Sequence, residues 1–357
     1  MKSMHVVEFG QPLQATETAT PQPTGAQVVL RVRAAGVCHT DLHLWHGGYD
    51  LGNGKTLSLK ERGVQLPLTM GHETVGMVVA VGPEVQSVKP GDLRLVYPWI
   101  GCGQCDACQE GRENYCLKPA TLGINRPGGF ADHILVPNER YLINLQGLPA
   151  VSAAPLACSG LTCYSALNKF NRAALKRTPL VIFGAGGLGL MAIKLLQALD
   201  GMGAVVLDPD PVKRQAALDA GALAALDPTE ADTLQNLQKT VNKPIECVLD
   251  FVSNPATSTL AFDMLTKGGH LVCVGLFGGA ASWPLPLLAI KALTIQGSYV
   301  GSLSELQELV ALIAEKKLTS LIPFHTCGLN ELSQALESLE KGHVVGRVIM
   351  VPDEEHA

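Results

Sequence analysis

A glycine-rich hexapeptide, Gly184-Ala185-Gly186-Gly187-Leu188-Gly189, constrains the fold of this chain more than any other segment. It follows a short apolar run at 181–183 and opens an apolar helical pattern at 188–199. A strand, a glycine turn and a helix in this order are typical of a parallel βαβ unit. Further short strands alternate with helices downstream, at 204–207, 211–220, 247–251, 257–265 and 271–274. The alternation predicts an α/β fold with a doubly wound parallel sheet of the Rossmann type.

The three spaced glycines of this turn predict a dinucleotide site. Gly184 permits the tight turn, Gly186 lets the backbone approach a pyrophosphate, and Gly189 lets the helix pack closely on the strand. Gly187 and Leu188 lie at the start of the helix, where free N–H groups and the positive end of the helix dipole favour phosphates. The alternative is a glycine turn without a ligand.

Asp208 ends the next predicted strand, about 20 residues after the glycine turn, as expected for a ribose-binding carboxylate. A carboxylate there accepts hydrogen bonds from the adenosine ribose hydroxyls and repels a 2′-phosphate, so NAD is favoured over NADP. Lys213 follows as a second candidate for the ribose. The alternatives are a surface aspartate and a solvated helix lysine.

Four cysteines within one short segment, Cys102, Cys105, Cys108 and Cys116, have the spacing C-x2-C-x2-C-x7-C. Four thiolates so close together can enclose a tetrahedral Zn²⁺ with no open position, which favours a structural zinc site over an iron–sulfur cluster or disulfides. The net charge of −5 provides no basic field for nucleic acid, which argues against a zinc-ribbon module that binds it.

Two other cysteines and a histidine stand in motif-like surroundings: Cys38, His72 and Cys158. Each alone reads most simply as a buried thiol or an ordinary histidine. Together, two cysteines and one histidine form one of the ligand sets of catalytic zinc, with the fourth position open. Spacing alone does not bring the three together.

The rest of the chain divides into three parts. Residues 1–155 are rich in Val, Gly and Pro and contain the predicted strands 27–34 and 75–81; 156–295 carry the alternating α/β pattern; 296–357 contain an amphipathic helix at 303–315 and return to the first domain. The polar segment 49–65 is interpreted as a surface loop with room for a short helix. We expect it to shape a pocket or a subunit contact.

Composition indicates a well-packed protein in a reducing compartment. Hydrophobic residues make up 47% of the chain and charged residues 17%, which is enough apolar material for large cores. The first ten residues lack an apolar signal-peptide region, and the ten cysteines do not form a disulfide framework, so a cytoplasmic location is expected. The apolar window 180–199 is read as a buried strand and helix, with no membrane association.

The motifs, taken in order, resemble the zinc-dependent medium-chain alcohol dehydrogenases, especially the microbial NAD-linked branch. They are Cys-His-Thr-Asp-Leu-His at 38–43, Gly-His-Glu at 71–73, the four-cysteine lobe, the segment around Cys158, the glycine turn with Asp208, and Gly346-Arg347. The resemblance implies a β-rich GroES-like catalytic domain beside the Rossmann domain, and a homotetramer, with a dimer as the alternative. It also implies two Zn²⁺ per subunit. Cys38, His72 and Cys158 would hold the catalytic ion, and Cys102, Cys105, Cys108 and Cys116 the structural one.

By the same resemblance, four residues take part in or support the chemistry. Thr40 matches the hydroxyl that hydrogen-bonds the substrate oxygen, and His43 the distal member of a proton relay through the nicotinamide ribose hydroxyl to water. Asp41 matches the carboxylate that orients the zinc-binding histidine. Glu73 matches the glutamate that can approach the metal during ligand exchange.

Five more residues match positions that contact ligands in the family. His39 and Arg347 fall where the cofactor pyrophosphate is contacted, and Tyr49, Tyr97 and Trp99 where substrate-pocket side chains lie. For the three aromatic residues an ordinary core role is the alternative.

The expected activity is reversible hydride transfer between a small-molecule alcohol and NAD⁺, giving an aldehyde or ketone and NADH. The alternatives are a same-fold aldehyde or ketone reductase, a polyol dehydrogenase, and a non-catalytic zinc- and nucleotide-binding protein. The last is disfavoured because the catalytic ligands and both relay residues are present.

Overall fold

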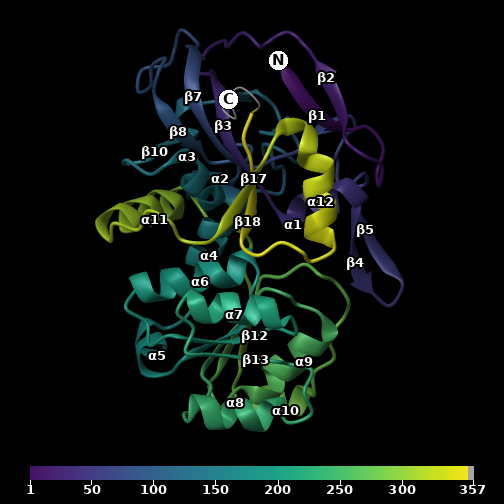
Figure 1. The fold of residues 1–357 in the computed structure, drawn as a ribbon, viewed down its shortest axis with the longest axis vertical. Helices are drawn as coiled ribbons and strands as arrows, with labels where there is room; N and C mark the ends of the chain where they lie inside the picture. Colours follow the sequence, from purple (N-terminus) through teal and green to yellow (C-terminus); the bar gives the residue numbers. More distant parts are fainter. Residues whose placement is uncertain (353–357) are drawn as a thin grey trace. The chain divides into compact units, whose positions relative to one another are not determined.

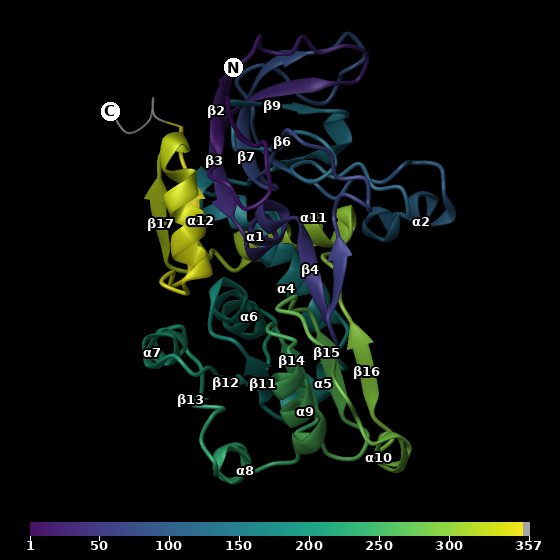
Figure 2. The ribbon, with the colours of Figure 1, turned by 90° about the vertical axis from the view of Figure 1, so that its right-hand side faces the viewer.

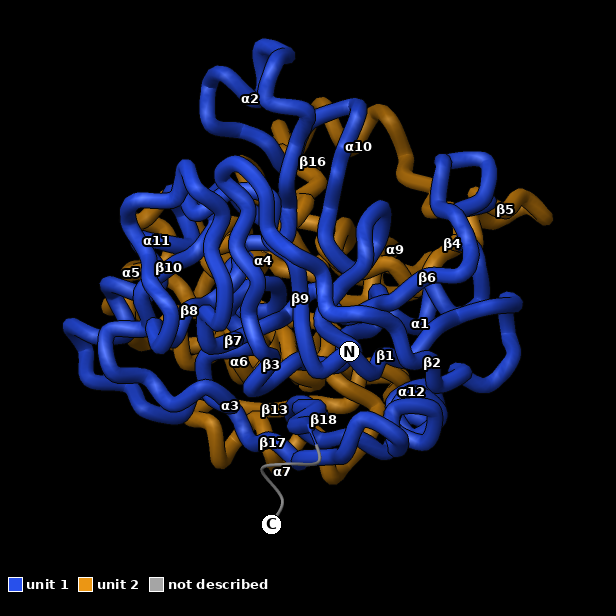
Figure 3. The backbone as a smooth tube through the Cα atoms, turned by 90° about the horizontal axis from the view of Figure 1, so that it is seen from above, with its two compact units in different colours: residues 1–48, 58–161, 301–357 blue, residues 49–57, 162–300 orange. Residues whose placement is uncertain are grey.

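The computed structural model describes residues 1–352, and the chain forms two compact units (Figure 3). Unit 1 contains residues 1–48, 58–161 and the segment from 301 onward; unit 2 contains 49–57 and 162–300. The chain therefore enters unit 2 twice. The domain boundaries expected from the sequence, 1–155, 156–295 and 296–357, stay a prediction.

Unit 1 is built on two β-sheets. The larger has the order β10-β8-β7-β3-β18-β17, with β9 paired to β3, and the smaller has the order β2-β1-β6. Their strands are β1 Lys2–Val6, β2 Gln14–Glu17, β3 Val28–Val37, β6 Leu68–Thr69, β7 Glu73–Val81, β8 Leu93–Val96, β9 His133–Val136, β10 Leu142–Asn144, β17 Phe324–Cys327 and β18 Arg347–Met350. In Figure 1 the yellow C-terminal segment supplies β17, β18 and α12, so the end of the chain completes the large sheet.

The register of the two longest strands brings distant residues together. The strands predicted at 27–34 and 75–81 are present but longer, as β3 and β7, and they pair antiparallel along most of their length. Both consist largely of valine and alanine, whose buried side chains fit a sheet covered on its faces. Gly36 near the end of β3 lies opposite Glu73 at the start of β7, so the residues just beyond these ends meet.

Short helices connect and flank the sheets of unit 1. They are α1 His39–His46, α2 Asp106–Gln109, η1 Glu113–Tyr115, η2 Glu139–Tyr141, α3 Ala150–Ala153, η3 Ala154–Ala157, α11 Leu303–Glu315, η4 Leu329–Glu331 and α12 Leu332–Glu340. The amphipathic helix predicted at 303–315 is α11, which begins with a capping box between Ser302 and Glu305.

Unit 2 contains a parallel six-stranded sheet in the order β13-β12-β11-β14-β15-β16 (Figure 2). Its strands are β11 Leu180–Phe183, β12 Ala204–Leu207, β13 Ala224–Leu226, β14 Cys247–Asp250, β15 His270–Cys273 and β16 Thr294–Gly297. If β11, the strand directly before the glycine turn, is numbered 1, the order is the 3-2-1-4-5-6 of a dinucleotide-binding fold. The strand order reverses between β11 and β14. The predicted fold class is confirmed.

The helices of unit 2 are α5 Arg172–Arg177, α6 Gly187–Ala198, α7 Pro211–Asp219, α8 Thr233–Val241, α9 Pro255–Met264 and α10 Leu285–Ile290, with α4 Ser159–Asn168 spanning the unit limit. Val181, Phe183, Leu207 and Val248 are at most 1% exposed at the centre of the sheet. The apolar window 180–199 is thus a buried strand followed by a helix, as expected.

The segment 49–65 differs from its prediction because it forms a β-hairpin and no helix. Strands β4 Gly48–Gly52 and β5 Lys55–Ser58 pair with each other, joined by Asn53 and Gly54. Both joining residues have positive φ, 53° and 73°, as a type I′ turn requires. Asn-Gly is the strongest short-range signal for such a turn, and it was available in the sequence.

Within residues 1–352 no single helix has the length and apolarity needed to cross a membrane; one bent pair, Ala150–Ala157 with Ser159–Asn168, meets the criteria on length and composition.

Candidate metal and dinucleotide sites

Cys38, His72 and Cys158 converge in unit 1, although 34 and 86 residues of chain separate successive members. One ligand atom from each lies within 4.8 Å of the others, and all three side chains are buried. The two Sγ atoms are 4.0 Å apart. The hydrogen bond between them, with burial opposing it, lowers the pKa of Cys38 well below the usual thiol value, toward the thiolate that binds metals.

Asp41 connects two of these residues. It lies in the first turn of α1, is fully buried, and its Oδ2 accepts a 2.8 Å hydrogen bond from the backbone N–H of Cys38. Its Oδ1 lies 3.4 Å from Nδ1 of His72 and 3.4 Å from the backbone nitrogen of Gly71. One carboxylate therefore fixes both the cysteine backbone and the imidazole.

The donor set fits a zinc ion. Nδ1 of His72 has the 3.4 Å contact with Asp41, whereas Nε2 has no hydrogen-bond partner among the described residues, although the imidazole is buried. A buried imidazole nitrogen without a partner, beside two thiols, fits a metal ion with sulfur and nitrogen ligands.

Glu73 follows His72 and forms a buried ion pair. Its carboxylate binds the guanidinium of Arg347 through two contacts, one of them 2.9 Å from Nε, and accepts a 3.0 Å hydrogen bond from the backbone of Ser159. Burial raises the pKa of Glu73, while the positive charge of Arg347 opposes the rise. Gly36 is required beside it, because a Cβ at that position would lie 1.9 Å from a Glu73 oxygen.

Thr40 and His43 lie on α1, three residues apart and therefore on one face of the helix. Both are half-buried, and burial lowers the pKa of His43. His39, the first residue of the helix, is exposed.

The three predicted pocket residues differ in their surroundings. The ring centroid of Trp99 lies 5.4 Å from that of His72, and its indole N–H donates to the carbonyl of Ala157, directly before Cys158. Tyr97 is fully buried, and its hydroxyl donates to the carbonyl of Gly301 at 2.9 Å. Tyr49 is half-buried in β4 of unit 2.

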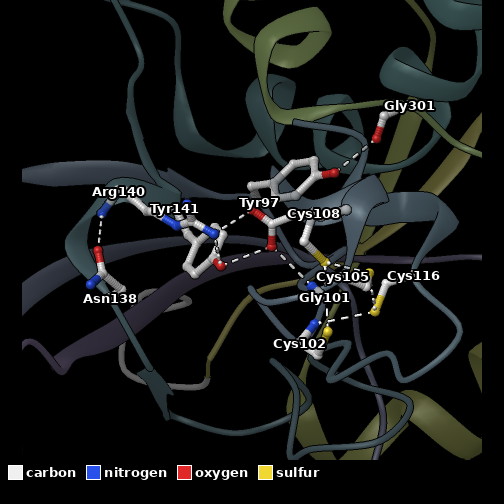
Figure 4. Close-up of polar contacts among 11 residues, drawn as sticks. Tyr97, Gly101, Cys102, Cys105, Cys108, Cys116, Asn138, Arg140, Tyr141 and Gly301 are labelled. Carbon is white, nitrogen blue, oxygen red and sulfur yellow. Dashed lines mark hydrogen bonds and ion pairs between the residues drawn. The ribbon is translucent and has the colours of Figure 1, made fainter. Parts of the chain in front are cut away.

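The four sulfurs of Cys102, Cys105, Cys108 and Cys116 also converge within 4.8 Å (Figure 4). Sulfur pairs are separated by 3.5, 3.8 and 4.0 Å. Four sulfurs at about 2.3 Å from a tetrahedral Zn²⁺ are about 3.8 Å apart, whereas a disulfide needs about 2.05 Å. The cysteines are all free thiols, so the disulfide alternative is wrong and the geometry fits a single ion.

A buried carboxylate that the sequence analysis missed ties this lobe to the sheet (Figure 4). Glu113 accepts hydrogen bonds of 2.9 Å from the backbone of Gly101 and from the hydroxyl of Tyr141, and it pairs with the guanidinium of Arg140. Burial raises the pKa of Tyr141 to about 12, and its ring stacks on Tyr97 with centroids 6.2 Å apart. Because these contacts span 28 residues of sequence, no local pattern indicates them.

We expect Cys105→Ser to destabilise the protein while leaving its chemistry intact. Opening a four-thiolate site removes metal affinity, and the loss of a structural metal costs roughly 4 kcal/mol or more. At this size that corresponds to a fall in Tm of about 10 °C. Thermal unfolding with zinc analysis measures it, with Cys327→Ser, a buried thiol outside both clusters, as the control. Equal Tm and zinc content in both variants would contradict the assignment.

In unit 2 the three glycines of the turn differ in conformation and surroundings. Gly184 has a φ of +93°; a Cβ on Gly189 would lie 2.0 Å from the carbonyl oxygen of Gly184; and a Cβ on Gly186 would meet nothing within 4 Å. Gly184 therefore needs conformational freedom and Gly189 permits close packing of the helix on the turn, while the backbone at Gly186 is open to approach. Gly187 and Leu188 begin α6, whose N-terminus offers free N–H groups.

Asp208 follows β12 beside this turn. Its Oδ2 accepts a 2.8 Å hydrogen bond from the backbone of Ala185, and its Oδ1 one of 2.9 Å from Asp210. Lys213 is half-buried on α7. Its neighbour Arg214, which the sequence analysis did not single out, donates to the carbonyl of Asp208 at 2.8 Å. The carboxylate is therefore held at the edge of the glycine turn, as a dinucleotide site requires.

The chain matches known proteins over nearly its whole length. Residues 24–147 match the alcohol dehydrogenase GroES-like domain, and residues 187–315 match the zinc-binding dehydrogenase domain. It is 36% identical over 353 residues, 99% of this chain and 100% of the relative, to an NAD-dependent alcohol dehydrogenase of Sulfurisphaera tokodaii. It is 32% identical to D-arabinose 1-dehydrogenase (NADP(+)) of Saccharolobus solfataricus, covering 98% and 97% of the two chains.

Among solved structures, the alcohol dehydrogenase of Aeropyrum pernix superposes with a TM-score of 0.88 at 31% identity, covering 99% of this chain and 100% of that one. The family matches, the full-length relatives and the two converging ligand sets agree with one another. The chain therefore belongs to the family of zinc-dependent medium-chain alcohol dehydrogenases.

Proposed function

We propose that this protein catalyses reversible hydride transfer between a small-molecule alcohol and NAD⁺, with Cys38, His72 and Cys158 as the ligands of its catalytic zinc. The observation that carries the proposal is the buried cluster of two thiols and one imidazole, with Asp41 fixing the imidazole. Its open fourth position is the feature that separates catalytic from structural zinc sites. Cys102, Cys105, Cys108 and Cys116 hold the structural ion.

When bound, zinc supplies Lewis acidity toward the substrate oxygen and NAD⁺ accepts the hydride. The residues of the chain orient the alcohol and move its proton. The hydroxyl of Thr40 accepts the hydrogen bond of the alcohol, and His43, one helical turn further, passes the proton to water. Burial keeps His43 neutral at physiological pH, so it can take up that proton.

Glu73 and Arg347 support the metal cluster through the backbone next to Cys158. Their ion pair is anchored to Ser159, the residue after Cys158, so it positions the third ligand. In unit 2, the glycine turn and the first turn of α6 bind the pyrophosphate, and Asp208 and Lys213 bind the adenosine ribose. The family resemblance gives His39 and Arg347 as further candidates for pyrophosphate contact. Trp99, whose ring lies 5.4 Å from that of His72, forms a wall of the substrate pocket. The family resemblance gives Tyr97 and Tyr49 as further candidates for pocket residues.

The direct test is NADH formation on a panel of primary, branched secondary, benzylic, allylic and polyol substrates, each with NAD⁺ and NADP⁺. Activity with NAD⁺ that is lost on zinc removal and restored by zinc supports the proposal. No turnover of any alcohol by protein that retains two zinc ions per subunit would overturn it.

A polyol or sugar dehydrogenase is the second candidate. It is favoured by one observation, the 32% identity to a protein named D-arabinose 1-dehydrogenase (NADP(+)). Asp208 argues for NAD in this chain, because its carboxylate would repel a 2′-phosphate. The polyol substrates of the panel separate the two functions.

Replacing Asp208 by serine is expected to raise the ratio of kcat/KM with NADP⁺ to that with NAD⁺ by at least about tenfold, equivalent to about 1.4 kcal/mol. The change removes repulsion of the 2′-phosphate together with the ribose contacts. Asp208→Asn keeps an acceptor for the backbone of Ala185 and isolates the effect of charge. An unchanged ratio in both variants would mean that Asp208 does not face the ribose.

The subunits assemble as a homotetramer located in the cytoplasm. The compact region 116–136 supports this assembly by its resemblance to tetrameric microbial relatives. Light scattering on a sizing column measures the mass directly, and a monomer would contradict the proposal.

A further inference from the structure

Residues 49–57 of the β4–β5 hairpin belong to unit 2, although the chain on both sides of them belongs to unit 1 (Figure 3). Within unit 2 the hairpin contacts residues 278–280, which follow β15. The backbone N–H of Gly279 donates to the carbonyl of Asp50 at 3.3 Å. A Cβ on Gly52 would lie 2.5 Å from the nitrogen of Ala280, and a Cβ on Gly278 would lie 2.7 Å from the carbonyl oxygen of Asp50. Glycines on both sides therefore allow the two backbones to touch.

The opposite side of this segment rests on the end of β14. The backbone N–H of Phe277 donates to the carbonyl of Val252 at 3.2 Å, and that of Gly275 to the carbonyl of Asp250 at 3.1 Å. A Cβ on Gly279 would lie 2.7 Å from the ring of Pro255. The segment 275–280 is thus held between the β14–α9 turn and the hairpin.

Residues 275–280 lie at the edge of the sheet where a dinucleotide cofactor is expected to bind. Dinucleotides bind outside the carboxyl ends of the strands, across the point where strand order reverses, which here lies between β11 and β14. Asp208, after β12, marks the adenosine side. The nicotinamide half therefore extends to the side of β14 and β15, where residues 275–280 begin.

We propose that the β4–β5 hairpin is a brace that holds residues 275–280 in position for the nicotinamide half of NAD, an inference that rests on the proposed cofactor. The hairpin contributes no ligand of its own. The hairpin sets the affinity for the cofactor by fixing residues 275–280. Without the hairpin, only the β14–α9 turn would hold this segment. Asp50, Gly52 and Gly278 are positioning residues in this device.

Two glycines of the hairpin supply a matched pair of variants. Gly52 and Gly54 have nearly the same φ, +75° and +73°, so alanine strains the backbone equally at both. Only Gly52 contacts residues 278–280, whereas a Cβ on Gly54 would meet nothing within 4 Å. Gly278→Ala disturbs the same contact from the other side, and Gly268→Ala, also at positive φ with nothing within 4 Å, is its control.

The experiment measures the Kd of NADH by its fluorescence and the Kd of AMP by displacement of NADH, on the intact zinc-loaded protein. Gly52→Ala and Gly278→Ala are expected to raise the Kd of NADH by about tenfold, while the Kd of AMP, which occupies only the adenosine side, stays unchanged. Gly54→Ala and Gly268→Ala are expected to match the unmodified protein in both constants.

Zinc content and Tm identify any variant that has failed to fold. If Gly52→Ala fails to fold, the comparison of Gly278→Ala with Gly268→Ala tests the brace. Equal NADH affinity in Gly52→Ala and Gly54→Ala, or an equal loss of AMP and NADH affinity, would overturn the brace. A changed oligomer mass in Gly52→Ala, with NADH binding intact, would also overturn the brace, because the hairpin would then be a subunit contact. Failure of the unmodified protein to bind NADH would instead refute the proposed cofactor.

Discussion

Cys38→Ser is expected to lower kcat by about a thousandfold or more while leaving the fold intact. A Lewis-acid metal contributes several kcal/mol to transition-state stabilisation, and about 4 kcal/mol corresponds to a factor of a thousand. The side chain is small, and its backbone is held by Asp41, so the helix start survives the loss of the thiolate. Steady-state kinetics and metal analysis measure the effect, with zinc expected to fall from two ions per subunit to about one.

Cys327→Ser serves as the control because Cys327 is also a buried thiol of unit 1 but belongs to neither cluster. It should keep both zinc ions and normal turnover. Retention of most activity in Cys38→Ser, with only one zinc bound, would show that the catalytic ion is held elsewhere.

Breaking the ion pair between Glu73 and Arg347 is expected to cost about 3–5 kcal/mol of stability, because the remaining partner becomes an uncompensated buried charge. The two side chains are 0% and 5% exposed, so solvent cannot replace the missing partner. Glu73→Gln and Arg347→Met each isolate one charge. Urea unfolding monitored by tryptophan fluorescence gives the loss for each variant.

The double variant Glu73→Gln/Arg347→Met decides whether the two charges act as a pair. Removing both charges should cost clearly less than the sum of the single changes, since neither charge is then left alone. Additive losses would show that the two residues contribute independently. Arg347 is also proposed as a cofactor contact, and the NADH affinity of Glu73→Gln, measured in parallel, tests that proposal.

The sequence predicts those parts of the protein whose determining residues lie close together in the chain. The glycine turn lies within six residues, and the four-cysteine lobe within fifteen, so strand, turn, helix and metal spacing can be read together. The Asn53-Gly54 turn is equally local, but the polar composition of 49–65 favours a loop, which conceals the turn signal.

Other features are invisible until the chain folds. Cys38 and His72 come together because β3 and β7 pair with Gly36 opposite Glu73. Cys158 joins them from the end of η3, where the backbone of Ser159 binds Glu73. Glu113 has no signal of its own, since its partners Arg140 and Tyr141 follow much later in the chain. Strand register decides the first case, and it depends on packing across the whole sheet. In the second case, the contact between η1 and η2 forms only in the folded chain.

The arrangement around Asp41 has a consequence for how such a protein can change over time. By binding the backbone of Cys38 and approaching Gly71 and His72, one carboxylate closes the chain between residues 42 and 70 into a loop whose ends are fixed. The free energy of closing a loop grows only slowly with its length, about 0.6 kcal/mol for each doubling. A change in the length of the segment that carries the β4–β5 hairpin is therefore expected to cost little at the metal cluster. Asp41 thus sets the geometry of the first two ligands of the cluster largely independently of the length of the chain between them.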